Sequence, residues 1–193
     1  MTARELFYRV KPRWDKYKLS KDIYLMPQRG IDDVSNKSEW GYYQFLPCLI
    51  DTINPKQIIE LGGAMGVACV MMCEAENKPD IYSITLEEHG LEFSYINKEY
   101  PNLHKIIGDD LDLKNWEGVD LEKTDIWFID SLHTEIQLRK ELLIYKEFFK
   151  SGAILLLDDI YMPELFTVWK DLLYDKFDAT AWLHFSGFGI CII

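Results

Sequence analysis

Short apolar runs alternate with segments of helical periodicity along most of this chain. The apolar runs predict strands at residues 57–61, 81–86, 105–107, 124–129 and 152–157. The segments with helical spacing predict helices at residues 66–76, 91–99, 135–149 and 163–174. Repeated strand–helix units favour an α/β fold: a Rossmann-like, doubly wound and mostly parallel sheet with helices on both faces.

The C-terminal end of the pattern differs from the rest. Two more strands are predicted close together, at 179–185 and 188–192, and Gly187 between them indicates a tight connection. No helix can join such a pair, so one of the two strands must run antiparallel to its neighbour. These two strands bring the predicted sheet to seven.

The first part of the chain follows another pattern. Residues 27–38 are rich in turn formers and predict a loop, and residues 39–53 predict a helix that ends before Pro55. We therefore expect an N-terminal basic arm or lid at 1–38 and one domain at 39–193. A chain of 193 residues is long enough to bury a good core.

Charge is distributed unevenly. The formal net charge is −11, but residues 1–21 carry seven Lys or Arg against Glu5 and Asp15, so they contribute +5 and the remainder −16. A solvated N-terminal helix or arm that packs on an acidic body is favoured over an anion-binding tail. The acidic balance disfavours a nucleic-acid partner, whose backbone it would repel.

Composition also bears on the cellular compartment of the protein. No apolar run approaches the length of a membrane span, and the N-terminus lacks the apolar core of a secretory signal. The four cysteines show neither a Cys-x-x-Cys pair nor a matching histidine spacing, so they are expected to be free core residues rather than zinc ligands. We expect a cytoplasmic protein without a membrane partner. The sequence leaves homo-oligomer formation open.

A turn of small residues follows the first predicted strand. It reads Glu60-x-Gly62-x-Ala64-x-Gly66, with Gly63 also inside it, and small residues let a ligand approach the backbone closely. The carboxylate of Glu60 is a poor neighbour for a pyrophosphate and suits a ligand with an amino group or another positive charge. The alternative is a tight strand-to-helix turn that binds nothing.

The next two strand ends carry similar residues. Glu87 follows the second strand, where an acid can accept both hydroxyls of a ribose. Gly108, Asp109 and Asp110 follow the third strand. For Glu87 alone, a solvated helix-capping acid is an equally good interpretation.

Acids also end the fourth and fifth predicted strands. Asp130 ends the run at 125–130, and Asp158 and Asp159 end the run at 153–159, while His133 follows Asp130 by three residues. Ligands of open α/β sheets bind beyond the carboxyl ends of the strands, so these acids are expected to converge. Carboxylate oxygens suit hard cations such as Mg²⁺. The competing interpretations are helix N-caps for the aspartates and a solvent-facing helix start for His133.

With these residues in place, the chain resembles the class I S-adenosylmethionine-dependent methyltransferases over about residues 40–193. Glu60-x-Gly62-x-Ala64-x-Gly66 is similar to their first motif. The segment 125–160 resembles the metal-dependent small-molecule O-methyltransferases, among them the catechol enzymes, the macrocin-type sugar enzymes and the related cephalosporin-hydroxylase group. His133 resembles the sugar branch, although that branch usually has Glu-Asp where this chain has Asp158-Asp159.

This resemblance implies a role for each residue. The cofactor S-adenosylmethionine would be bound by Glu60, Gly62, Gly63, Ala64, Gly66, Glu87, Gly108, Asp109, Asp110 and Asp130. Glu60 would lie near its amino-acid end, Glu87 on its ribose, and Asp109 or Asp110 near its adenine. Mg²⁺ or another divalent cation would be held by Asp130, Asp158 and Asp159. His133 would be the general base, with Asp130 beside it, and the acceptor would be a hydroxyl of a sugar, a catechol or another small natural product.

Other interpretations stay open. The chain could be a non-catalytic or metal-independent binding protein of the same fold, or a hydroxylase-like or nicotinamide-dependent enzyme; a nucleic-acid methyltransferase is the weakest option. Trp40, Tyr42 and Tyr43 could line an aromatic substrate slot, but core packing is the commoner role. His89, His104 and His184 show no partner spacing and are interpreted as structural or solvated. Glu135 and Arg139 are expected to form an i,i+4 surface pair.

Overall fold

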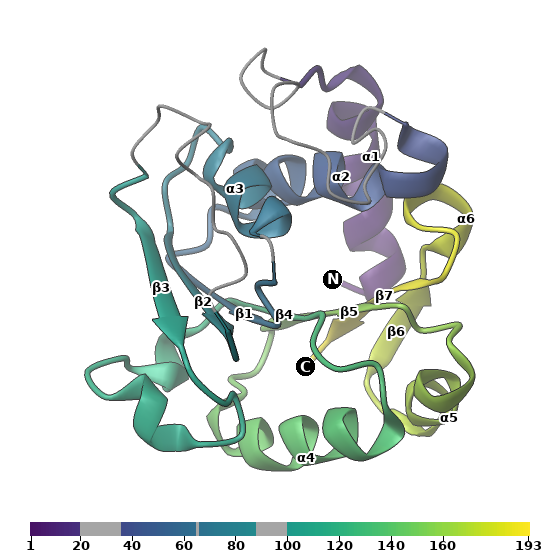
Figure 1. Ribbon diagram of the computed structural model, residues 1–193. Coiled ribbons are helices and arrows are strands. Elements are labelled where there is room, and N and C mark those ends of the chain that lie inside the picture. The colour runs from purple at the N-terminus through teal and green to yellow at the C-terminus, as the bar shows by residue number, and fades with distance from the viewer. Residues whose placement is uncertain (20–35, 65, 88–99) are drawn as a thin grey trace.

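Seven strands form one sheet in the computed structural model, which describes residues 1–19, 36–64, 66–87 and 100–193 (Figure 1). The strands are β1 Gln57–Leu61, β2 Asp80–Thr85, β3 Leu103–Ile107, β4 Ile126–Ile129, β5 Ile154–Asp158, β6 Asp175–Asp178 and β7 Phe188–Ile192. Their order is β3-β2-β1-β4-β5-β7-β6. The first five are parallel, and β7 is antiparallel to both β5 and β6. The predicted mostly parallel sheet with an antiparallel C-terminal strand is confirmed.

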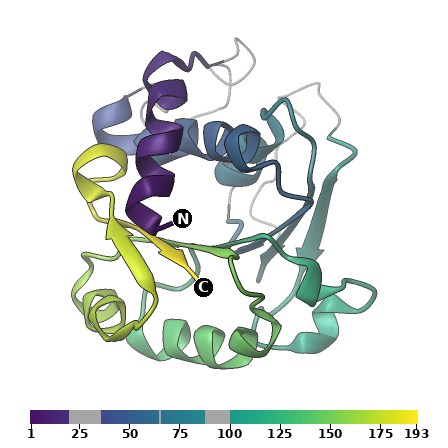
Figure 2. The same cartoon turned by 180° about the vertical axis from the view of Figure 1, so that it is seen from behind.

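Helices cover both faces of this sheet (Figures 1 and 2). They are α1 Ala3–Lys16, α2 Lys37–Ile53, α3 Val67–Cys73, α4 Glu135–Tyr145, α5 Pro163–Asp171 and α6 Thr180–Leu183, with short 3₁₀ turns at Leu113–Trp116, Leu121–Lys123 and Lys146–Phe148. Helices α1, α2 and α3 cover one face, and α4 and α5 the other. The predicted helix at 91–99 lies outside the described residues.

The strands divide the core into two clusters by the alternation of their side chains. On β5, Ile154 and Leu156 face the side of α1, α2 and α3, whereas Leu155 and Leu157 face α4 and α5. Every residue of β1, β4 and β5 is buried, which explains why the sequences of these strands are mostly apolar.

The predicted strand at 179–185 is wrong. The strand lies at Asp175–Asp178, and Thr180–Leu183 forms the short helix α6. Ala179 is the N-cap of this helix, and Oδ1 of Asp178 just before it accepts the backbone N–H of Thr180 at 3.0 Å. Helix α6 then packs its apolar residues against the cluster around α1 and α2, which a straight strand could not do.

Helix α1 belongs to the core rather than extending from it. Thr2 and Glu5 form a capping box at its start, and Leu6, Phe7 and Val10 are fully buried. The favoured interpretation of the basic N-terminus, a helix packed on the body, is confirmed for residues 3–16. Most of the predicted loop at 27–38 lies outside the described residues. None of the helices described here is long and apolar enough to cross a membrane.

Candidate active site

The turn after β1 needs small residues for steric reasons. Gly62 has φ +93°, and a Cβ at this position would lie 2.0 Å from the carbonyl oxygen of Asp130. A Cβ on Gly63 would lie 2.2 Å from Oγ of Ser83. Strands β4 and β2 therefore approach the backbone of this turn directly, and Gly66, at φ +81°, then starts α3.

A cavity of about 450 Å³ lies beside this turn, at the carboxyl ends of β1 to β4. It is lined by Gly62, Ala64, Ile84, Thr85, Leu86, Gly108, Asp109, Asp110, Leu111, Asp130, Ser131, Leu132 and Gln137. Six of the ten residues expected to bind the cofactor are among them: Gly62, Ala64, Gly108, Asp109, Asp110 and Asp130. The cavity lies where ligands of open α/β sheets bind.

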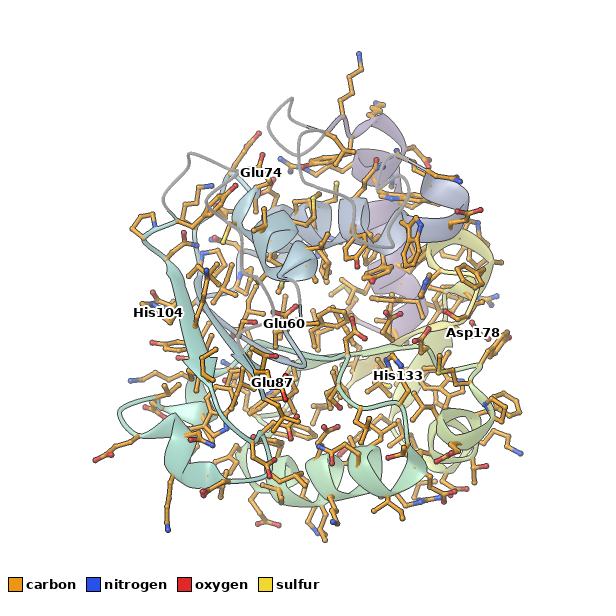
Figure 3. All side chains as sticks on the ribbon, viewed as in Figure 1. Glu60, Glu74, Glu87, His104, His133 and Asp178 are labelled. Carbon is orange, nitrogen blue, oxygen red and sulfur yellow. The ribbon has the colours of Figure 1, made fainter. Side chains whose placement is uncertain are left out.

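The other four expected cofactor residues do not line the cavity. Glu60 and Gly63 lie behind the turn, packed against Ser83. Gly66 is the first residue beyond the turn, and Glu87 is exposed past the end of β2. Figure 3 shows Glu60 and Glu87 toward the middle of the molecule, whereas His104 lies at the β3 edge.

Glu60 is a buried acid with a hydroxyl partner. It is 1% exposed, and its Oε2 accepts a hydrogen bond from Oγ of Ser83. Burial raises the pKa of Glu60 to about 7, and the Ser83 hydrogen bond offsets part of that rise. Near neutral pH the carboxyl group therefore changes charge readily.

The three aspartates of β4 and β5 converge with His133. The Nε2 atom of His133 lies 3.2 Å from Oδ1 of Asp130 and 3.3 Å from Oδ2 of Asp159. Asp158 is the last residue of β5, and Asp159 follows it with φ +55°, a backbone conformation that non-glycine residues rarely adopt. Two neighbouring parallel strands thus deliver all three carboxylates to one place.

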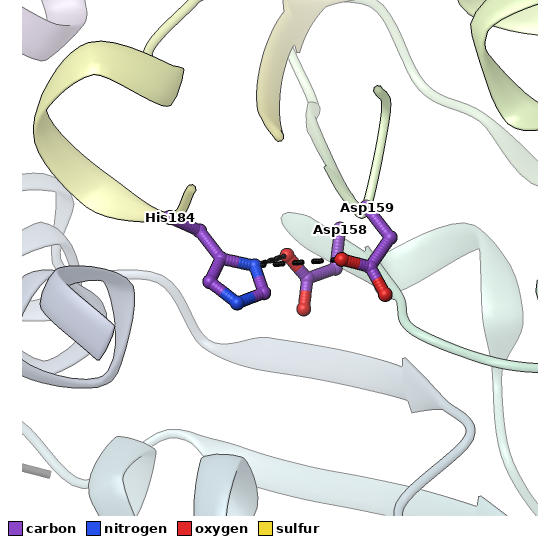
Figure 4. A group of neighbouring side chains, drawn as sticks. All are labelled: Asp158, Asp159 and His184. Atoms are coloured by element: carbon purple, nitrogen blue, oxygen red, sulfur yellow. Dashed lines mark hydrogen bonds and ion pairs between the residues drawn. The ribbon is translucent and has the colours of Figure 1, made fainter. Parts of the chain in front are cut away.

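His184 completes this group, although the sequence analysis interpreted it as structural or solvated. It is 4% exposed, and its Nδ1 lies 2.9 Å from Oδ1 of Asp158 and 3.6 Å from Oδ1 of Asp159 (Figure 4). The antiparallel pairing of β7 with β5 brings it there. Asp158 pairs with Phe188, so the connection before β7 must pass beside the end of β5. We call Asp130, His133, Asp158, Asp159 and His184 the acid–histidine cluster.

The carboxylates of this cluster repel one another, and Asp158, Asp159 and His184 are buried. Burial and then the charge of Asp158 raise the pKa of Asp130 well above its usual range. Burial likewise raises the pKa of Asp158, although the hydrogen bond from His184 opposes it. The hydrogen bond to Asp130 raises the pKa of His133. Within the described ranges, every ion pair of the three aspartates is with a histidine.

A second buried acid group lies beneath the cavity, and the sequence analysis missed its central member, Glu141. The amide nitrogen of Gln137 donates to Oδ1 of Asp110 at 2.8 Å and to Oε1 of Glu141 at 2.9 Å. The hydroxyl of Ser131 also donates to Glu141. Burial raises the pKa of Glu141 to about 8 and also raises the pKa of Asp110. Glu141 is on a helix of ordinary charge pattern, so nothing in the sequence marked it.

The aromatic residues of α2 divide between core and site. Tyr42 and Tyr43 are buried in the core cluster, as the commoner interpretation expected. Trp40 is half-buried, and its ring centroid lies 5.0 Å from that of His184. Glu135 and Arg139 form the expected surface pair, with Nε 2.8 Å from Oε1. His89 lies outside the described residues.

A protein-family model described as "Methyltransferase domain" matches residues 59–160, more than half of the chain. The match begins in β1 and ends after Asp159, so it contains the glycine turn and four members of the acid–histidine cluster. The chain therefore belongs to this family of methyltransferase domains, and the resemblance to S-adenosylmethionine-dependent methyltransferases stated from the sequence is confirmed.

Solved methyltransferase structures share the whole fold. A candidate caffeoyl-CoA O-methyltransferase from Staphylococcus aureus matches with TM-score 0.66 and 16% identity, over 98% of this chain and 99% of that one. The O-methyltransferase TomG from Streptomyces achromogenes, solved with S-adenosylmethionine, gives 0.62 and 11%, over 100% and 99%. A Bacillus cereus O-methyltransferase bound to S-adenosylhomocysteine gives 0.57 and 12%, over 99% and 90%. A search of curated proteins finds no match.

Proposed function

We propose that this protein is an S-adenosylmethionine-dependent O-methyltransferase. One observation carries the proposal: Asp130 lines the 450 Å³ cavity and also contacts His133 in the acid–histidine cluster. A ligand in the cavity and a substrate at the cluster would therefore meet at one residue. The structures of TomG and of the Bacillus cereus enzyme, each solved with this cofactor or its demethylated product, support the choice of ligand.

The cavity residues suit this cofactor chemically. Small residues at Gly62, Ala64 and Gly108 leave room for its sugar and its methionine chain. Asp109 and Asp110 offer acceptors for its adenine amine. Glu60, behind the turn, supplies negative charge near the amino group, and Glu87 is the proposed partner of the ribose.

The cluster suits a divalent cation such as Mg²⁺, held by Asp130, Asp158 and Asp159. These carboxylates converge where Asp158 and Asp159 are buried and Asp130 is partly exposed, and within the described ranges their ion pairs are with histidines alone. Such an oxygen-rich donor set is what hard cations bind. A bound cation would fix the acceptor oxygen and lower the pKa of its hydroxyl.

Residues of this chain accept the proton of the acceptor hydroxyl. His133 Nε2, between Asp130 and Asp159, takes the hydroxyl proton as general base, and the two carboxylates stabilise the imidazolium that forms. The acceptor oxygen then forms its bond to the methyl carbon as the sulfur–methyl bond breaks. The cofactor leaves as S-adenosylhomocysteine, and the proton stays on His133.

The proposed acceptor is a small molecule with adjacent oxygens, such as a sugar diol, a catechol or another natural product. A small acceptor suits a cluster whose Asp158, Asp159 and His184 are buried and whose His133 is only partly exposed. The four cysteines are free and buried, which agrees with the proposed cytoplasmic location.

Calorimetric titration of S-adenosylhomocysteine tests the proposal, with Mg²⁺ and with EDTA, on wild type and on Asp158→Ala. We expect micromolar binding of the cofactor product and a separate Mg²⁺ signal that the variant loses. Binding of the cofactor product without any metal signal would favour a metal-independent or non-catalytic protein of this fold. If S-adenosylhomocysteine does not bind, the proposed function is wrong.

A further inference from the structure

Two histidines lie against the three carboxylates, and the donor set is therefore not purely oxygen. One donor atom from each of Asp158, Asp159 and His184 lies within 4.8 Å of the other two, and all three residues are buried. The two aspartates come from the end of β5 and the histidine from the connection between α6 and β7, side by side through the β5–β7 pairing (Figure 4).

The spacing of these atoms matches that of neighbouring ligands on one ion. Two ligands at about 2.1 Å from an ion, at octahedral or tetrahedral angles, lie roughly 3.0 to 3.4 Å apart. Nδ1 of His184 lies 2.9 Å from Oδ1 of Asp158 and 3.6 Å from Oδ1 of Asp159. The imidazole nitrogen therefore already occupies the position of a third ligand beside the two acids.

The surroundings fix this arrangement. The His184 ring lies 5.0 Å from the rings of both Trp40 and Tyr42, which limits its orientation. Ser186 donates to Oδ1 of Asp159, the oxygen that faces His184. A Cβ on Gly187 would lie 2.5 Å from the backbone nitrogen of Tyr161, so this connection is packed tightly against the segment that carries Asp159. Donors held this rigidly favour one ligand geometry.

An imidazole ligand changes which cation is preferred. Mg²⁺ selects oxygen donors and keeps several waters, whereas imidazole nitrogen suits first-row transition ions such as Fe²⁺, Co²⁺ and Zn²⁺, and Mn²⁺ accepts mixed sets. We propose that His184 is a metal ligand together with Asp158 and Asp159, and that the resident cation is a divalent transition ion rather than Mg²⁺. This inference rests on the proposed function, whose cation it specifies.

The alternative is a cluster that never binds metal, with His184 acting as a hydrogen-bond donor to Asp158. It predicts the same apo contacts but a different response to added cations. Binding measurements with the metals alone therefore decide between the two.

The experiment compares MnCl₂ and MgCl₂ by calorimetry on wild type, His184→Gln and His104→Gln. His104 is the matched control, because its Nε2 also lies 3.2 Å from an aspartate, Asp80, but at the β3 edge away from the cluster (Figure 3). We expect wild type to bind Mn²⁺ at least about tenfold more tightly than Mg²⁺. His184→Gln should lose at least about tenfold in Mn²⁺ affinity and little in Mg²⁺ affinity, while His104→Gln should match wild type.

Pulsed EPR of the Mn²⁺-loaded wild type supplies a second measurement that does not depend on how well His184→Gln folds. We expect a nitrogen hyperfine coupling from a directly bound imidazole, and we expect it to persist in His133→Gln. Equal affinities for Mn²⁺ and Mg²⁺, together with no nitrogen coupling, would overturn the inference, and the proposed Mg²⁺-dependent function would remain. Absence of any metal binding would also overturn it, and S-adenosylhomocysteine binding in the same samples shows whether the proposed function itself survives.

Discussion

Gly62 shows at the scale of one residue why the first motif contains glycine. Two effects act there: a positive φ of +93°, and a carbonyl oxygen of Asp130 that would lie 2.0 Å from a Cβ. Gly118 allows the two effects to be measured separately, because it has a similar φ of +86° but no atom within 4 Å of its Cβ position. The two glycines therefore form a matched pair.

We predict that Gly62→Ala destabilises the fold far more than Gly118→Ala. The second variant meets only left-handed backbone strain, worth about 1 kcal/mol. The first also pushes β4 away from the turn, and we expect a loss of at least about 3 kcal/mol in the free energy of unfolding. Urea unfolding of both variants measures this, and similar losses would show that backbone conformation alone explains the glycine.

Single residues also mark the limits of the sequence analysis. Asp130, Asp158, Asp159 and His133 could be predicted, because each follows an apolar strand at short spacing and the ends of parallel strands meet. His184 and Glu141 could not. The first is brought to the cluster by strand pairing 26 residues later in the chain, and the second by the burial of one face of α4. Both contacts are tertiary and leave no local pattern.

At the scale of elements, the sequence pattern predicted the buried strands well and the edge strand β6 poorly. Strands β1, β4 and β5 are mostly apolar because both faces of the sheet are covered there. The edge strand β6, Asp175–Asp178, has no fully buried residue, and three of its four residues are charged, so its sequence does not predict a strand. The apolar residues after it suggested a strand, but they form α6 under α1 and α2 instead.

Helix α1 supplies the prediction at this scale. Phe7 is fully buried against Phe45, Phe177 and Trp182, whereas its neighbour Tyr8 is 48% exposed. We expect Phe7→Ala to cost about 3–5 kcal/mol of unfolding free energy, as large buried aromatics do, and Tyr8→Ala less than about 1 kcal/mol. Chemical denaturation of both variants gives the numbers. A loose N-terminal arm would instead make both substitutions nearly neutral.

At the scale of the whole molecule, several acids with raised pKa values lie near the carboxyl ends of the parallel strands. Glu60 and Glu141 have pKa values raised by burial to about 7 and about 8, and the pKa values of Asp110, Asp130 and Asp158 are raised as well. A net charge of −11 adds to the cost of ionising them. These strand ends hold both the cavity and the acid–histidine cluster, so a single region sets both the stability and the proposed ligand binding.

We predict that the protein loses stability as pH rises from 6 to 8.5. An acid whose pKa is raised in the folded state binds its proton more tightly there than in the unfolded chain. The stability gained from this tighter binding is lost as pH rises from about 4.5 through the folded-state pKa of about 7 or 8. His133 acts in the same direction: its raised pKa gives stability that is present below 6.5 and is lost above the folded pKa. For Glu60 alone, a shift from 4.5 to about 7 corresponds to about 3 kcal/mol over the whole titration, of which about 1 kcal/mol is lost between pH 6 and 8.5.

Unfolding free energies at pH 6 and 8.5 in EDTA measure this loss, and Glu60→Gln isolates one part of it. Glutamine can still accept from Ser83 and cannot ionise, so the variant should lose less stability over this interval than wild type, whereas the exposed Glu117→Gln should behave like wild type. Adding MnCl₂ at pH 8.5 should recover stability, because a cation that binds only the folded state stabilises it by mass action. Stability that rises toward pH 8.5 in EDTA would contradict the account of the buried acids.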